Sequence, residues 1–189
     1  MEIKRIAVLG AGAMGHGIAQ LAAMAGFDVN LRDISEEFLA NGMKNIRWSI
    51  GKLIEKGRIS PAEADKTLKR IRTVVPLKEA VEDVDFVIEA IPEILKLKQE
   101  VFKEIDGYAP AHAILASNTS VLSISDMAAA TNRPQKVIGM HFFNPAQLMR
   151  LVEVIMGQKT DSDTRDVTMD LAKKIGKEPV LCKKMFQVS

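Results

Sequence analysis

The sequence is poor in the residues that build disulfide frameworks and metal sites. Its 189 residues include one cysteine and three histidines. One cysteine excludes an internal disulfide bond and fits a reducing compartment. The sequence contains no CxxC pair, no HExxH motif and no paired-carboxylate spacing. We therefore expect neither a metal site nor a hydrolase.

Long apolar runs and an excess of one charge are also missing. No stretch approaches the roughly 18 apolar residues that a transmembrane helix needs. The 26 lysine and arginine residues are nearly balanced by 24 acidic ones, so the formal net charge is +2. Basic residues form no clustered patch of the kind that nucleic acid or a membrane surface attracts. We expect a cytoplasmic protein that binds neither nucleic acid nor membrane.

A glycine-rich turn stands near the N-terminus in a specific setting. An apolar run at residues 6–9 precedes it, and a helical segment, a second short strand and Asp33 follow it; the turn consists of Gly10, Ala11, Gly12, Ala13, Met14 and Gly15. Strand, glycine turn, helix, strand and acid in this order are the fingerprint of dinucleotide binding. Gly10 permits the tight turn, Gly12 lets a pyrophosphate approach the backbone, and Gly15 allows close helix packing.

The helix after this turn is expected to hold phosphates with its free N–H groups and the positive end of its dipole. Asp33 lies where a carboxylate accepts hydrogen bonds from the adenosine ribose, which favours NAD over NADP. The alternative is a βαβ turn with a purely structural role. The combination of strand, helix and acid favours the nucleotide site.

Strand-like and helical segments alternate along the rest of the chain. This pattern predicts an α/β fold with a Rossmann-like, doubly wound, mostly parallel sheet. Two helices, at residues 35–56 and from residue 60 to about 71, follow the second strand and should form a hairpin. Because one helix suffices for a crossover, this hairpin is an insertion. It can project over a ligand, or it can be two solvated amphipathic helices that pack together.

Ligands of such sheets bind beyond the carboxyl ends of the strands. Four segments are expected to present polar groups there, at residues 10–15, 89–93, 117–120 and 141–144. Their convergence follows from the topology and does not depend on any single residue.

His141 is the one histidine at such a position, in a loop expected after a strand at residues 137–140. A neutral imidazole there can accept a proton from an alcohol while hydride leaves the same carbon. Glu153, in the next strand, can hold that imidazole. A structural histidine and a surface carboxylate explain the same residues, so both interpretations stay open. His16 and His112 are interpreted as structural.

Five segments carry a resemblance to one family, the 3-hydroxyacyl-CoA dehydrogenases: GAGAMGHGIA, LRDIS, VIEAIPE, LASNTSVLSI and VIGMHFFNPAQLMRLVEVI. The likeness covers about residues 3–181. It implies NAD-dependent interconversion of an L-3-hydroxyacyl-CoA and a 3-ketoacyl-CoA, in fatty-acid oxidation or butyrate formation. The short-chain 3-hydroxybutyryl-CoA is the expected substrate.

The resemblance also implies roles for single residues. His141 matches the catalytic base and Glu153 its carboxylate partner, while Ser120 and Asn144 match residues that contact substrate and nicotinamide. The matches to NAD contacts are the glycine turn at residues 10–15, Asp33, Glu93 and Lys98; the matches to contacts with the CoA moiety are Ser49 and Lys56.

The resemblance implies an NAD-binding domain at residues 1–182 and a divergent tail at residues 183–189. That tail lacks the proline-glycine-phenylalanine segment with which the family's C-terminal helical domain begins. Because that domain closes over the acyl group and builds the dimer, an NAD-binding module that is not catalytic by itself is the alternative expectation. An apolar face left without that domain is expected to be exposed or paired with another copy of the chain.

Overall fold

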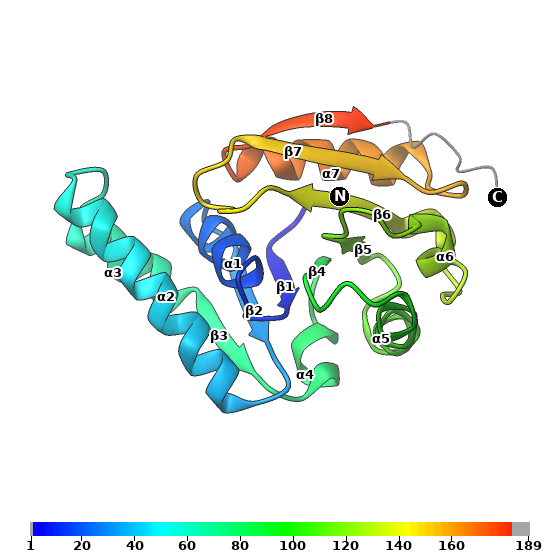
Figure 1. Ribbon diagram of the computed structural model, residues 1–189, viewed down its shortest axis with the longest axis horizontal. Coiled ribbons are helices and arrows are strands. Elements are labelled where there is room, and N and C mark those ends of the chain that lie inside the picture. Colours follow the sequence, from blue (N-terminus) through cyan, green and yellow to red (C-terminus); the bar gives the residue numbers. More distant parts are fainter. Residues whose placement is uncertain (1, 183–189) are drawn as a thin grey trace.

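Short runs of buried apolar residues form the centre of one eight-stranded sheet (Figure 1). The computed structural model describes residues 2–182. The strands are β1 (Arg5–Leu9), β2 (Asp28–Arg32), β3 (Ile71–Val74), β4 (Phe86–Glu89), β5 (Ile114–Ser117), β6 (Val137–Phe142), β7 (Leu151–Met156) and β8 (Glu178–Cys182).

The strand order is β3-β2-β1-β4-β5-β6-β7-β8. Strands β1 to β6 pair in parallel, β7 pairs antiparallel with β6, and β8 pairs parallel with β7. The direction in which the chain adds strands changes between β1 and β4, which is where doubly wound sheets hold their ligands. The predicted Rossmann-like, mostly parallel sheet is confirmed.

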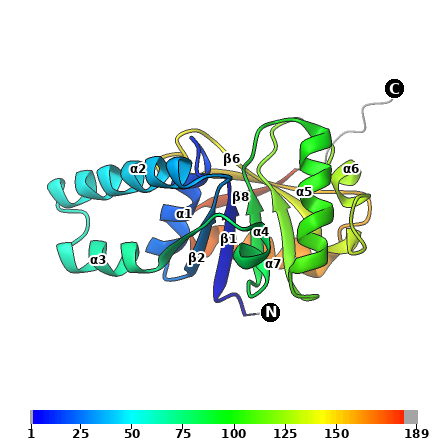
Figure 2. The same ribbon diagram turned by 90° about the horizontal axis from the view of Figure 1, so that it is seen from below.

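Helices cover both faces of this sheet (Figure 2). They are α1 (Gly15–Met24), α2 (Glu36–Glu55), α3 (Pro61–Lys69), α4 (Leu77–Val81), α5 (Leu95–Tyr108), α6 (Ile124–Ala128) and α7 (Ser162–Lys174), with a short 3₁₀ helix at Pro134–Lys136. Strand β1 shows the consequence: Ile6 and Val8 join the core under α1, whereas Ala7 and Leu9 join the core under α4 and α5. Burial on both sides explains the continuous apolar run.

The predicted hairpin is formed by α2 and α3, which extend from the side of the sheet in Figure 1. Ser35 caps α2 by accepting a hydrogen bond from the Phe38 N–H, and Ser60 and Glu63 form a capping box at α3. One detail of the prediction is wrong: the second helix ends at Lys69, and Ile71 begins β3.

The predicted end of strand β6 is also wrong. His141 was expected in a loop, but β6 continues to Phe142 because β7 runs back along it and pairs with those residues. The antiparallel register places His141 directly opposite Glu153. The alternating buried residues Ile138, Met140 and Phe142 belong to one core cluster, so the polar His141 interrupts the apolar run without ending the strand.

The described part of the chain has no helix with the length and apolar character of a membrane span. Within residues 2–182 there is also no cluster of three or more metal-binding side chains. The predicted tail at residues 183–189 lies outside the described residues, and the proposed domain boundary stays a prediction.

Candidate active site

The glycine turn joins β1 to α1, and two of its glycines are required by the backbone. Gly10 has φ of +99°, and a Cβ there would lie 2.6 Å from the carbonyl oxygen of Ala90. A Cβ on Gly15 would lie 1.7 Å from the carbonyl oxygen of Gly10. Any side chain at these positions would therefore open the turn.

Gly12 has the opposite environment, since within residues 2–182 no heavy atom beyond its own residue and its two chain neighbours lies within 4 Å of the place a Cβ would occupy. In the described structure the N–H groups of Gly12, Ala13 and Met14 form no hydrogen bond. They stand at the N-terminal end of α1, where the helix dipole adds positive potential. Open space beside unpaired donors is the arrangement that receives phosphate groups.

Asp33 directly follows β2, and its side chain contacts the backbone of the same glycine turn. Its Oδ2 accepts a hydrogen bond of 2.7 Å from the Ala11 N–H, and its Oδ1 accepts one of 2.7 Å from the Ile34 N–H. The carboxylate is half-buried, so it keeps an accessible side. The sequence suggested ribose recognition, and the structure adds an anchoring contact to the glycine turn.

His141 and Glu153 form a hydrogen bond of 2.8 Å between Nδ1 and Oε2. Their side chains are 16% and 33% exposed, so the pair is open to solvent at the sheet edge. The Phe143 ring lies 4.7 Å from the imidazole, centre to centre. Because Nδ1 is held by the carboxylate, Nε2 is the nitrogen available to a ligand.

A buried ion pair supports the neighbouring strand ends. Glu89, fully buried at the end of β4, accepts hydrogen bonds of 2.6 Å from Lys98 Nζ and from Ser117 Oγ. Lys98 is 1% exposed, and its Nζ also lies 3.3 Å from Glu93 Oε2. Its predicted contact with NAD stays a prediction; in the structure it links Glu89 to Glu93.

Glu93 holds the turn that follows β5. Its Oε1 accepts hydrogen bonds from the Thr119 hydroxyl and, at 3.0 Å, from the Ser120 N–H. Partial burial acts to raise the pKa of Glu93, but these hydrogen bonds and the charge of Lys98 outweigh it and lower the pKa. The carboxylate is therefore ionised while it positions Ser120.

Asn118 joins this turn to the strand that bears the imidazole, because its Oδ1 accepts a hydrogen bond of 2.8 Å from the Phe142 N–H. Glu89, Ser117 and Asn118 lie in the segments that the sequence places at this edge, but no sequence motif assigns any of them a role of its own. An acid at the end of an apolar strand, as in VIEA, is the signal that could have identified Glu89. Asn118 carries no comparable signal, because its role depends on the β5–β6 contact.

The remaining predicted residues lie apart from these contacts. Asn144 is exposed in the loop after β6, and its side chain forms no hydrogen bond within residues 2–182. Ser49 is half-buried on α2 and Lys56 is exposed just after it. His16 contacts the Gly12 carbonyl through Nδ1, and His112 pairs with Asp85, as structural histidines do.

This strand order, with a glycine turn open to phosphate at the switch point, defines a dinucleotide-binding domain. Comparison with protein families agrees, since the model of the "3-hydroxyacyl-CoA dehydrogenase, NAD binding domain" family matches residues 5–185. The chain belongs to this family, and the cofactor of the family is NAD. The resemblance inferred from the motifs is confirmed.

Similar proteins carry names of the same kind. A probable 3-hydroxybutyryl-CoA dehydrogenase of Bacillus subtilis is 49% identical over 180 residues, which are 95% of this chain and 62% of that protein. The crystal structure of (S)-3-hydroxybutyryl-CoA dehydrogenase from Ralstonia eutropha superposes with a TM-score of 0.93 at 39% identity, covering 95% of this chain and 63% of the other.

The alpha subunit of the fatty acid oxidation complex of Pseudomonas entomophila is 43% identical over 180 residues, a quarter (25%) of its length. The chain thus spans less than two thirds of the length of each of these relatives.

The residues present fit NAD. The open space at Gly12 and the three unpaired N–H groups suit a pyrophosphate, and the accessible side of Asp33 suits a ribose. Glu93 follows β4, and the turn that it holds follows β5. Both therefore lie at the carboxyl ends of the parallel strands, as the glycine turn after β1 does.

Replacing Asp33 with alanine is expected to weaken NAD binding about 10- to 100-fold, because the ribose loses its hydrogen bonds to a charged carboxylate. The preference for NAD over NADP should narrow, because the acid no longer opposes a 2′-phosphate. Titration calorimetry with both nucleotides measures the change. Asp33→Asn is the matched control, since it keeps an oxygen for the Ala11 N–H and removes the charge. An unchanged NAD/NADP ratio in both variants would exclude ribose recognition by Asp33.

Proposed function

We propose that this chain is the cofactor-binding and catalytic part of an NAD-dependent L-3-hydroxyacyl-CoA dehydrogenase. The observation that carries the proposal is the 2.8 Å contact of His141 with Glu153, on the sheet edge to which the glycine turn also belongs. Bound NAD supplies the hydride acceptor when the alcohol is oxidised.

His141 acts as the general base in this proposal. Its Nε2 takes the proton of the substrate 3-hydroxyl, while Nδ1–H stays donated to Glu153. The carboxylate holds the ring orientation and stabilises the imidazolium that forms. Ser120 and Asn144, exposed at the adjoining strand ends, are proposed to orient the hydroxyl and the nicotinamide.

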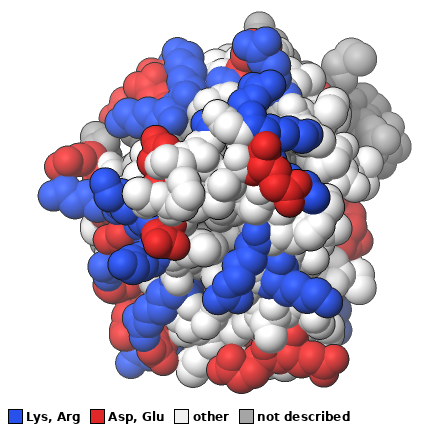
Figure 3. Space-filling view, turned by 90° about the vertical axis from the view of Figure 1, so that its left-hand side faces the viewer, with Lys and Arg blue, Asp and Glu red and all other residues white. Residues whose placement is uncertain are grey.

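An acyl-CoA is the proposed substrate, with 3-hydroxybutyryl-CoA the first choice, as the names of the similar dehydrogenases suggest. Coenzyme A carries several phosphate charges, and Figure 3 shows Lys and Arg side chains, with Asp and Glu side chains among them, on the side of the molecule from which the hairpin projects. Exposed basic residues of α2 and the turn after it are Lys44, Arg47, Lys52, Lys56 and Arg58. Ser49 and Lys56 are the proposed contacts with the CoA moiety.

Two assays test the function. Oxidation of NADH with acetoacetyl-CoA is followed by absorbance, and NAD binding is measured by calorimetry on the same preparation. Turnover supports the dehydrogenase. Binding without turnover supports the alternative, a module that binds NAD and is not catalytic by itself; absence of binding contradicts both.

We also propose a cytoplasmic location, which fits the single cysteine and the balanced charge. Copies of the chain are proposed to associate. The exposed apolar side chains of Leu148, Leu151, Val180 and Leu181, which lie in or next to β7 and β8, support this assembly.

A further inference from the structure

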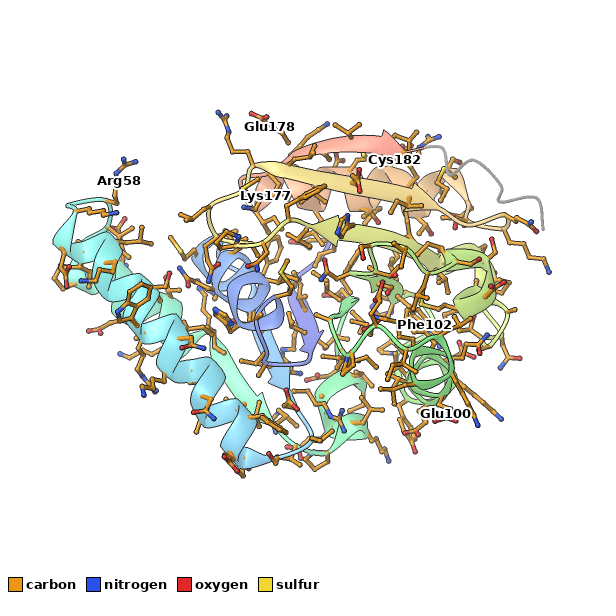
Figure 4. All side chains as sticks on the ribbon, in the orientation of Figure 1. Arg58, Glu100, Phe102, Lys177, Glu178 and Cys182 are labelled. Atoms are coloured by element: carbon orange, nitrogen blue, oxygen red, sulfur yellow. The ribbon has the colours of Figure 1, made fainter. Side chains whose placement is uncertain are left out.

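Lys177 is a buried lysine that the proposed reaction does not use. It follows α7 and directly precedes β8, and it is 7% exposed (Figure 4). No carboxylate within residues 2–182 forms an ion pair with it. Its Nζ donates to two backbone carbonyls instead, at 2.6 Å to Ala146 and 2.8 Å to Met149. Burial lowers the pKa of this ammonium group.

Both carbonyls belong to the loop at residues 143–150, which joins β6 to β7 and carries Asn144. Within the described residues neither carbonyl accepts any other hydrogen bond. Ala146 is 1% exposed, so its carbonyl cannot turn to solvent without moving the loop. A lysine with several donors on a long stem can serve both oxygens at once.

The opposite side of the loop lies against the nucleotide-binding helix. A Cβ on Gly17 of α1 would lie 2.7 Å from Cδ of Gln147, so this side chain rests directly on the helix backbone. Within the loop, the N–H groups of Leu148 and Met149 both donate to the Pro145 carbonyl. The loop is thus fixed to α1 on one side and to Lys177 on the other.

We infer that Lys177 is a positioning residue: it holds the loop that carries Asn144 in register with His141 at the end of β6. This inference rests on the proposed dehydrogenase function. The hydrogen bonds of the Lys177 ammonium group within the described residues go to the loop backbone, so it acts on the reaction through that loop. Small displacements of a group that orients the reactants lower the rate of a reaction even when the catalytic base is intact.

Lys177→Met removes the donors and keeps a long unbranched stem. We expect kcat for acetoacetyl-CoA reduction to fall by about 10- to 100-fold, with KM for NADH changed much less. Lys177→Arg, which can donate to both carbonyls, should recover most of the loss. Lys174→Met, an exposed lysine at the end of α7, is the matched control and should behave like wild type. Wild-type kcat in folded Lys177→Met would overturn the inference.

A double-mutant cycle separates positioning from a general structural role. If Lys177 acts through Asn144, Lys177→Met should cost little further activity in an Asn144→Ala background. A structural role elsewhere in the fold predicts that the two losses multiply. If the kcat loss of the double variant equals the product of the two single losses, Lys177 does not act through Asn144 and the inference is contradicted.

A third measurement does not depend on turnover. Amide hydrogen exchange at residues 143–150 is expected to be at least about tenfold faster in Lys177→Met, with exchange in β1 and β4 unchanged. If the wild-type chain shows no turnover, the proposed function fails, yet this comparison still decides whether Lys177 holds the loop.

Lys177→Gln, whose side-chain amide keeps two N–H donors, replaces the methionine variant if that variant does not fold. Unchanged exchange in the loop would refute the role of Lys177.

Discussion

Replacing His141 with alanine is expected to lower kcat by about 10²–10⁴-fold, the usual loss when a positioned general base is removed. Binding of NAD should stay nearly unchanged, because the imidazole contacts Glu153 and Phe143 and lies on a strand apart from the glycine turn. Steady-state kinetics with acetoacetyl-CoA and NADH measure the first effect, and calorimetry measures the second.

Two further variants control this experiment. Glu153→Gln keeps an acceptor for Nδ1–H but removes the charge, so a smaller loss than that of His141→Ala is expected. His112→Ala changes a histidine that pairs with Asp85 at the other end of the strands, and it should leave kcat unaltered. Full activity in the His141 variant would remove the imidazole from the mechanism.

The largest effect on stability is expected from Lys98→Met. It leaves Glu89, which is fully buried, without its counter-charge. Breaking a buried pair in this way costs about 3–5 kcal/mol of unfolding free energy. For a chain of this size the thermal midpoint should fall by roughly 6–20 °C, as calorimetry or circular dichroism would measure.

The matched variant is Lys96→Met, an exposed lysine in the same helix, which should change stability by less than about 0.5 kcal/mol. The double variant Glu89→Gln/Lys98→Met removes both charges and keeps an oxygen for the Ser117 hydroxyl, so it should recover part of the loss. A midpoint for Lys98→Met equal to that of wild type would mean that the pair contributes nothing.

Much of the fold follows from local patterns in the sequence. Caps such as Ser35 and the box of Ser60 with Glu63 predict where α2 and α3 begin, because a side chain replaces the missing helical partners. Strand ends are less predictable, since they depend on which strand lies alongside. His141 shows this, because the antiparallel pairing with β7 places it inside β6.

The same distinction applies to the site. The glycine turn and Asp33 form a local motif, and the structure brings Ala11 and Asp33 into contact. The partners through which Glu89, Asn118 and Lys177 act lie between 9 and 31 residues away, so a local sequence motif does not reveal their roles. For Lys98, the sequence resemblance suggested a cofactor contact, whereas the structure encloses its ammonium group among protein oxygens.

The α2–α3 hairpin leaves the sheet after β2 and returns to it at β3, and these two strands are neighbours. The inner half of α2 is anchored through Leu39, Met43, Ile46 and Ile50, while the outer turns beyond Ile50 are more open to solvent. Changes in length or charge at that tip would alter its reach without shifting any strand register. Selectivity for the group attached to the substrate can therefore diversify in evolution while the proposed redox site at the carboxyl ends of the strands is inherited intact.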